Sequence, residues 1–534
     1  MGNINPTRSV AMSETSPEAR SKSIQLDKAV FWPSVIILCL IMTFCFLFPE
    51  AGSRGGKAIF HFISFKFDSV FECFTLGLFL LGLGVSFSRY GNIKMGLDHE
   101  TPDYSTGTWA FMLITGCSSA GLFYWGMVEP MYHITAPPFG IEPNSAAAAT
   151  WGVTYAMFHW GPAPWAYYGF TGALVAYFYY VRREPQLKGS LACEGFLGKK
   201  ARGSLGAFID IIVIISLAAG TAASLAILVP MIAVWAEKLL GIPRGLPLNI
   251  AIIVCWVGLF AYSVLSGINK GMKYLSDLNV WAAFGLVAVL LVLGPGVYIL
   301  SFTTESLGQM FQNFIQMSTW TDPVDKSGFP QNWTVFWWAF WAVYAVFLGI
   351  YVARISKGRT FREIYLMVVC CGTIGSVLMC GLLGSYTMYL TTEKIIPMVE
   401  IFTQQGPEYM IYELFCTLPC QWLVWPLVII VGFLSTATLY QSCAWTLAST
   451  CSKNMYQDEE PPKWHRLFWA VLLGALAVML TILGGLSAVQ AAAVIFAVPV
   501  LLVLVFMTLS FFRWADEDFG ESLEPEVLSL SKDR

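Results

Sequence analysis

Two short segments carry aromatic residues at a density that could bind a cation. Residues 159–168 read HWGPAPWAYY, and residues 333–344 read WTVFWWAFWAVY. On a helix, Trp337 and Trp341 are four positions apart and stack along one face. The faces of such rings attract methylated onium groups, which have no N–H to donate, by about 0.5–2 kcal/mol for each ring. The two segments therefore predict an aromatic cage for an onium cation, although packing and interfacial aromatic belts would explain the same composition.

A run of small residues, GCSSAG, occupies positions 116–121. Gly116, Ser118, Ser119 and Gly121 lower the helical preference of this stretch and leave its backbone open to close approach. One interpretation is a discontinuous helix whose freed carbonyls face a solute or ion. The other is close packing between helices through small residues, and the sequence leaves both open.

Hydroxyl side chains recur in two further apolar stretches, GTAAS at 220–224 and STATLYQS at 435–442. In a lipid-buried helix such hydroxyls can bond their own backbone, or they can supply hard oxygen ligands to a small cation. Thr221 and Thr438 are therefore candidate ion ligands. No other cofactor and no other metal is expected.

Two ionisable residues lie close to the aromatic segments. Glu129 precedes a proline at an expected helix end near an interface, and it is interpreted as a capping or pairing residue rather than a proton carrier. His159 is interpreted as a residue that packs between helices.

These segments must be positioned by membrane helices. Of the 534 residues, 56% are hydrophobic and 12% are charged, whereas soluble domains carry roughly 25% charged residues. A membrane-spanning helix needs about 20 mostly apolar residues, and twelve stretches qualify. They are 29–49, 69–90, 108–134, 146–181, 206–236, 247–267, 275–302, 333–355, 363–391, 421–451, 465–484 and 487–512. Segments 305–317 and 396–413 are predicted as surface helices.

The distribution of basic residues supports twelve spans with both termini in the cytoplasm. With that topology, 24 of the 31 Lys and Arg residues lie on the inside and 7 on the outside, as the positive-inside rule requires. The sequence therefore predicts a multi-pass protein of the cytoplasmic (inner) membrane. A polar tail at 1–28 and an acidic tail at 513–534 would both be cytoplasmic, and anionic lipid would repel the acidic one.

Other functional classes fit the sequence poorly. The chain has five histidines and no HExxH motif, so a membrane enzyme would lack a converging metal or acid–base set. No basic run indicates nucleic-acid binding, and no soluble signalling domain indicates a receptor. The chain is predicted not to be an enzyme.

Five strings, in this order, make the chain similar to the betaine/carnitine/choline transporter (BCCT) family over residues 28–512. They are FYWGMVEP (123–130), HWGPAPWAYYG (159–169), GTAASL (220–225), SGINKGMKYLSDLN (266–279) and ARISKGRTFRE (353–363).

The resemblance implies an all-α, LeuT-like fold and a homotrimer. Two leading helices (29–107) would precede two inverted five-helix repeats (108–302 and 333–512), with an external connecting segment at 303–332. It implies secondary active transport of a small quaternary-ammonium or sulfonium zwitterion, such as glycine betaine, carnitine or choline, by alternating access.

The resemblance also implies the residues that bind the solute. They are Trp160, Trp165, Tyr168, Phe336, Phe340, Trp341 and Tyr344, together with Tyr132, which matches the carnitine branch. Phe340 departs from the family, which usually has Trp there, so this position lacks an indole donor.

For ion coupling, the resemblance points to two different branches of the family. Thr438 matches the Thr of the sodium-coupled members, but Leu439 stands where they have Ser. Asn279 stands where the carnitine antiporter has an arginine that replaces the ion. Sodium is therefore a candidate coupling ion, and substrate/product exchange is the alternative to ion-coupled symport.

Overall fold

The computed structural model describes residues 24–97, 99–117, 120–184, 186–266, 269–455, 459–483 and 486–520. This part of the chain is predominantly helical. Two short strands, β1 (Gln25–Leu26) and β2 (Ser452–Lys453), pair in antiparallel fashion. They tie the segment before the first long helix to the segment after α21, and Lys188 Nζ strengthens this junction by pairing with the buried Asp27 carboxylate at 2.8 Å.

Within the described residues, nine helical segments are long and apolar enough to cross a membrane, or ten if one bent pair counts as a span. A multi-pass membrane protein is therefore confirmed. The nine are α2 (Lys28–Leu47), α4 (Asp68–Phe87), α10 (Ser204–Leu240), α11 (Leu246–Ser266), α15 with α16 (Phe329–Asn332 and Thr334–Ile355), α17 with η5 and α18 (Phe361–Ser376, Val377–Gly381 and Leu382–Thr392), α21 (Gln421–Thr450), α22 (Lys463–Leu483) and α23 (Leu486–Phe519).

The predicted third and fourth spans are not single helices, and this is one reason why the count falls below twelve. Residues 108–134 form α5 (Thr106–Cys117) and α6 (Ala120–Thr135), and residues 146–181 form α7 (Ala146–His159), α8 (Pro162–Ala176) and a π-helical turn, η2 (Tyr177–Val181). Each of these helices is shorter than a bilayer requires. The twelve-span count and the inverted repeats stay predictions.

The predicted seventh span, 275–302, is also wrong in shape. It is α12 (Asn269–Leu293) followed by α13 (Gly296–Gln312), and their axes differ by 111°. Gly294 and Pro295 lie at the bend, because proline lacks the N–H that would continue the helix and restricts the residue before it. The surface helix predicted at 305–317 is therefore the end of α13 and the short α14 (Phe314–Thr319).

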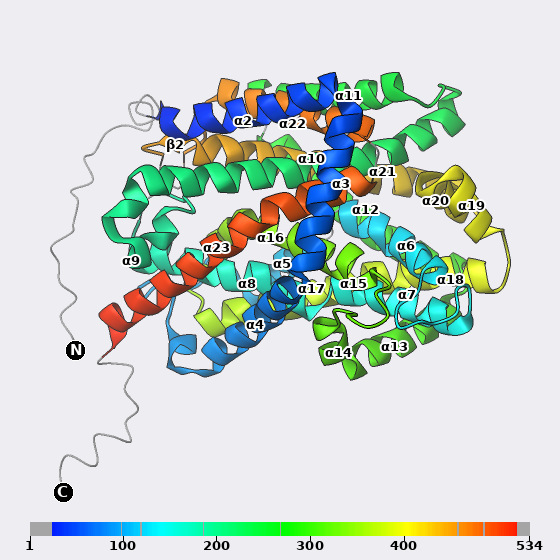
Figure 1. Ribbon diagram of the computed structural model, residues 1–534, viewed down its shortest axis with the longest axis horizontal. Helices are drawn as coiled ribbons and strands as arrows, with labels where there is room; N and C mark the ends of the chain where they lie inside the picture. Colours follow the sequence, from blue (N-terminus) through cyan, green and yellow to red (C-terminus); the bar gives the residue numbers. More distant parts are fainter. Residues whose placement is uncertain are drawn as a thin grey trace, which may run out of the picture.

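Two other segments differ from the prediction. Residues Pro49–Lys66, expected to connect the first two spans, form helix α3, which packs against α23 (Figure 1). Helix α23 runs on into the predicted acidic tail, where Arg182 lies 2.9 Å from Glu517 and 2.7 Å from Asp518. The beginning of the tail is thus a helix, and two of its carboxylates pair with arginine.

The remaining elements are short. The surface helix predicted at 396–413 is present as α19 (Met398–Gln405) and α20 (Pro407–Cys416). The others are η1 (Arg89–Asn92), η3 (Leu191–Cys193), α9 (Glu194–Leu197) and η4 (Gly198–Arg202).

Helices α8 and α16 lie side by side at the centre of the molecule and share a closely packed interface. Glycines on both helices permit this approach: a Cβ at Gly172 would lie 2.5 Å from Val352, and one at Gly349 would lie 2.6 Å from Thr171. Helix α16 carries one aromatic segment of the sequence, and the other runs from the end of α7 into α8.

Helix α4 packs on α17 through one glycine. A Cβ at Gly82 would lie 2.1 Å from a ring carbon of Tyr365, whose hydroxyl donates to Phe79 O at 2.7 Å. The ring is held by this bond and by its buried surroundings, so it cannot easily move away.

We expect Gly82→Ala to destabilise the protein by about 1–3 kcal/mol, the usual cost of overpacking. Thermal unfolding of the detergent-purified protein measures this as a lower midpoint. The matched control is Gly77→Ala on the same helix, which has open space at its Cβ and should leave the midpoint unchanged or raise it. Equal midpoints for the two variants would contradict the packing described.

Candidate functional site

The backbone breaks between α7 and α8, at Trp160 and Gly161. Proline at 162 and 164 explains the break, because these residues cannot donate to the carbonyls four positions earlier, at Phe158 and Trp160. The sequence pattern HWGPAP could have predicted it. The break leaves backbone carbonyls at the end of α7 that need donors from elsewhere.

Two indole groups supply these donors. Trp341 Nε1 of α16 donates to His159 O at 3.0 Å. Trp165 Nε1 of α8 donates to Trp160 O at 2.9 Å and also contacts Ser376 Oγ at 3.0 Å. The indoles are thereby fixed in orientation with their rings turned toward one another.

Trp160, Trp165, Tyr168 and Trp341 form what we call the four-ring cluster. Trp341 lies at its centre, with ring centroids 4.7 Å from Trp165, 4.7 Å from Tyr168 and 5.4 Å from Trp160. The Trp165 ring meets it edge to face at 75° and the Tyr168 ring is tilted by 37°. These four predicted residues, from the α7–α8 break, α8 and α16, are brought together.

A second row of rings continues along α16. Phe336, Phe340 and Tyr344 follow one another at 5.8 and 5.5 Å between centroids. The Tyr344 hydroxyl lies 3.0 Å from Ser224 Oγ of α10. Trp337 connects this row to the four-ring cluster, because its ring lies 4.9 Å from Phe336 and 4.9 Å from Trp160.

The rings lie inside the protein rather than against lipid. Trp337 and Trp341 are exposed by at most 1%, whereas Trp160, Trp165 and Phe340 keep 5%, 5% and 9%, so these three border some accessible space. A separate apolar cavity of about 310 Å³ lies between α2, α3, α10, α22 and α23 and is lined by none of the predicted residues.

Tyr132 is not brought to the four-ring cluster by any ring contact in the described residues. It packs instead on Trp333 and Phe402, at 4.9 and 4.8 Å. Nearby, Glu408 of α20 accepts a bond from the Tyr124 hydroxyl at 3.4 Å, and burial raises the pKa of this carboxyl. Tyr132 thus belongs to a neighbouring aromatic group toward α19 and α20.

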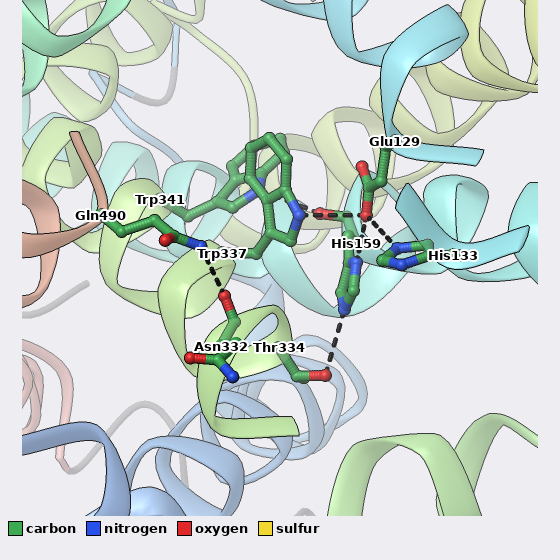
Figure 2. A network of polar contacts seen from close by, with 8 residues as sticks. All are labelled: Glu129, His133, His159, Asn332, Thr334, Trp337, Trp341 and Gln490. Carbon is green, nitrogen blue, oxygen red and sulfur yellow. Dashed lines mark hydrogen bonds and ion pairs between the residues drawn. The ribbon is translucent and has the colours of Figure 1, made fainter. Parts of the chain in front are cut away.

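Behind Trp337 lies a buried polar group formed by Glu129, His133 and His159, here called the Glu–His–His group (Figure 2). Glu129 Oε1 lies 2.5 Å from His159 Nδ1 and 3.1 Å from His133 Nε2. It also accepts from Trp337 Nε1 at 3.0 Å. All three members are fully buried.

Glu129 is therefore a pairing residue, as predicted, but its predicted position was wrong. The residue lies inside α6, not at a helix end near an interface. His159 likewise does more than pack, because its second nitrogen, Nε2, lies 3.1 Å from Thr334 Oγ1.

A metal ion is one conceivable occupant, since the three ligand atoms lie within 4.8 Å of one another. The distances favour hydrogen bonds instead. Around a metal with ligands at about 2.0–2.2 Å, the ligand atoms stand farther apart than the 2.5 Å that separates Glu129 from His159. Glu129 Oε1 is also already an acceptor for Trp337.

The residues predicted to open the third span are described in part. Gly116 lies in the last turn of α5 and Gly121 near the start of α6, while Ser118 and Ser119 lie outside the described residues. Two helices thus end and begin at the predicted stretch.

The candidate ion ligands all make other bonds. Asn279 Oδ1 accepts from Ser435 Oγ at 2.9 Å. Thr438 Oγ1 donates to Ser435 O at 3.0 Å, and Thr221 Oγ1 donates to Leu217 O at 2.7 Å. Asn279 and Thr438 thus share a neighbour, and among the described residues no hydrogen bond joins Thr221 to either of them.

Comparison with known families settles the class. The family model of the betaine/carnitine/choline family transporters (BCCT) matches residues 29–520. The chain belongs to this family. A BCCT protein is a transporter rather than an enzyme, and membership implies a solute of the betaine, carnitine or choline type and a lipid bilayer as its surroundings.

Sequence reasoning missed part of the site in this BCCT protein. Trp337 was paired with Trp341 from the helical spacing, but it was left out of the predicted solute-binding residues. The convergence of Glu129, His133 and His159 had no comparable signal, because the spacing between α6 and α7 is set by tertiary packing.

We expect Gly372→Ala, on α17, to displace Trp165, because a Cβ there would lie 2.2 Å from the indole ring. The shift would break the bond from Trp165 to Trp160 O and lower uptake of glycine betaine, carnitine or choline at least tenfold, roughly the effect of 1.4 kcal/mol. Uptake into proteoliposomes measures this. Gly258→Ala, which has open space at its Cβ, is the control, and equal uptake by both variants would refute the role of Trp165.

Proposed function

We propose that this BCCT protein carries a small zwitterion or cation with a trimethylated nitrogen or methylated sulfur, by secondary active transport with alternating access. The observation that supports this is the four-ring cluster, in which rings from α8 and α16 meet at the backbone break after α7. The onium head would rest against Trp160, Trp165 and Trp341, with Tyr344 completing the wall.

The chemistry of the cluster suits an onium head. A methylated nitrogen has a diffuse charge and no N–H, so ring faces serve it better than a hydrogen-bond acceptor. Each ring contributes about 0.5–2 kcal/mol, and more when water is excluded. A cage of carboxylates would attract the same cation but would repel the carboxylate at the other end of a betaine.

The opposite end of a zwitterionic solute needs a separate partner. We assign it to polar groups or helix N-termini near Gly116 and Gly121, because α6 begins in this stretch and a helix N-terminus favours negative charge. This position also accounts for the small residues there.

Exchange of one zwitterion for another is the coupling that we favour over sodium symport. A neutral zwitterion moves no net charge, so exchange needs no ion. The hydroxyls of Thr221 and Thr438 donate to backbone carbonyls, which leaves their oxygens able to bind a cation, but the side chain of Leu439 has no ligand atom to offer. Sodium remains the alternative, with Thr438 and Asn279 as its ligands. The proposed assembly is a homotrimer in the cytoplasmic membrane with both termini inside.

Counterflow in liposomes of defined membrane potential tests the substrate and the coupling together. Glycine betaine, carnitine with γ-butyrobetaine, choline and dimethylsulfoniopropionate are compared, with and without sodium, and leucine serves as the control solute. We expect onium solutes to exchange and leucine not to compete. Exchange that requires sodium would replace our choice of coupling, and no uptake of any onium solute would refute the substrate class.

We expect Trp341→Ala to weaken the apparent affinity for the transported onium solute by roughly tenfold or more, because it removes the central ring and one cation–π contact. Trp341→Phe should lie between this variant and wild type. Trp422→Ala is the control, since that side chain is 78% exposed on α21. Saturation of uptake in proteoliposomes measures the effect, and wild-type affinity in Trp341→Ala would remove this residue from the cage.

A further inference from the structure

The Glu–His–His group stands out as an ionisable site inside the apolar interior. Ionisable side chains cost free energy to bury inside a membrane protein, and they usually mark a pathway for a substrate, an ion or a proton. Its three members come from α6 and from the end of α7, directly behind the rings of α16 (Figure 2). The proposed function so far gives them no part.

A count of donors and acceptors shows where an added proton would reside. Trp337 Nε1 can only donate, so Glu129 Oε1 is an acceptor, and it can accept from both imidazoles as well. We take Glu129 as a carboxylate beside two neutral imidazoles, a state with a net charge of −1.

One imidazole can take a second proton without leaving it unpaired. If His159 becomes an imidazolium, Nδ1–H donates to Glu129 and Nε2–H donates to Thr334 Oγ1. If His133 did so, its Nδ1–H would have no acceptor, because this buried atom has no partner among the described residues. An unpaired buried donor is costly, so the proton belongs on His159.

The two protonation states differ in charge and leave the geometry intact. In the neutral imidazole, His159 Nε2 accepts from the Thr334 hydroxyl, which rotates to donate. In the imidazolium, the same hydroxyl accepts. Loss of the Nε2 proton thus changes the net charge of the group from zero to −1.

One indole donates directly to the Glu–His–His group, and a second indole donates to the backbone carbonyl of His159. Trp337 donates to Glu129 and packs on Trp160 at 4.9 Å, and Trp341 donates to the His159 carbonyl at 3.0 Å. A carboxylate that accepts from an indole N–H makes the ring richer in electrons and a better partner for a cation. Neutralising the group removes that effect and the direct attraction of the negative charge.

We propose that His159, paired with Glu129, is a proton-binding site, and that an onium head entering the four-ring cluster displaces this proton. The inference rests on the proposed function. The two cations compete for one negative charge in a medium of low polarity, where such effects are strong. By linkage, the proton weakens onium binding as much as the onium weakens proton binding.

Other titratable groups face this site and must be distinguished from it. Tyr155 of α7 has its ring 5.3 Å from that of His159. Cys380 of η5 faces Glu129. Glu72 of α4 lies beyond Trp338, from which it accepts a bond at 3.0 Å.

The test measures proton release on binding. Purified full-length protein in weakly buffered detergent solution is mixed with choline or glycine betaine, between about pH 5.5 and 8, where histidines usually titrate. A pH-sensitive dye reports the proton and tryptophan fluorescence reports binding. We expect wild type to release up to about one proton for each onium bound, with affinity falling up to tenfold for each pH unit on the acid side.

The variants locate the proton. His159→Gln and Glu129→Gln cannot hold the exchangeable charge, and we expect both to bind onium, more weakly for Glu129→Gln, with neither proton release nor pH dependence. Two matched controls should behave like wild type. Glu72→Gln alters a buried carboxylate that also accepts from an indole of α16. His465→Gln alters a buried histidine bonded to Trp469, on α22.

Each outcome is decisive. Onium binding by wild type without proton release and without pH dependence overturns the proposal even if no variant folds. Retained release in His159→Gln overturns it as well. Release that disappears on chelation with EDTA would indicate a metal ion in place of the proton and also overturn it. Absence of onium binding at every pH would instead refute the proposed function.

Discussion

The structure around the site depends on one constraint, which is that backbone carbonyls in a bilayer must find donors within the protein. Pro162 and Pro164 remove two amide hydrogens just where α7 ends. The carbonyl of Trp160, which loses its donor to Pro164, accepts from the indole of Trp165, and the carbonyl of His159 at the same break accepts from the indole of Trp341. In a soluble protein, water would donate hydrogen bonds to these carbonyls. Here the donors have to be side chains that reach into the break.

These two indole-to-carbonyl hydrogen bonds bring the rings together. An indole that donates to a fixed carbonyl loses most of its rotational freedom, so its ring face is held at a set angle. Trp341 and Trp165 both donate near one break, and their centroids therefore lie 4.7 Å apart. A cluster held in this way can receive a cation without first ordering its side chains, which reduces the entropic cost of binding.

Sequence patterns predicted part of this arrangement and could not predict the rest. The onium-type chemistry, the pairing of rings on residues 333–344 and the small-residue stretch at 116–121 are local features, readable from composition and helical spacing. Helix α3 was not predicted, because Pro49–Lys66 contains several glycines and charged residues and no long apolar run. The length rule for spans also treated residues 146–181 as continuous, although its prolines indicate otherwise.

The Glu–His–His group could not be predicted from local sequence patterns, for a different reason. Glu129 and His133 are four positions apart on one helix, which is a common structural pair, but His159 lies 30 residues away. Whether it reaches the same carboxylate oxygen depends on how α7 packs on α6. One close approach there is set by Gly152, where a Cβ would lie 2.9 Å from the carbonyl of Pro130.

The identity of each ring on α16 follows from the bonds that it must make. Trp337, Trp338 and Trp341 each have an acceptor for the indole N–H, in Glu129, Glu72 and the His159 carbonyl. Phe336 and Phe340 meet rings on their neighbours and have no polar group to satisfy. A tryptophan at 340, as is usual in the family, would bring a buried N–H that needs a partner. Phe340 thus gives up part of the cation–π attraction and keeps this wall of the site free of an unpaired donor.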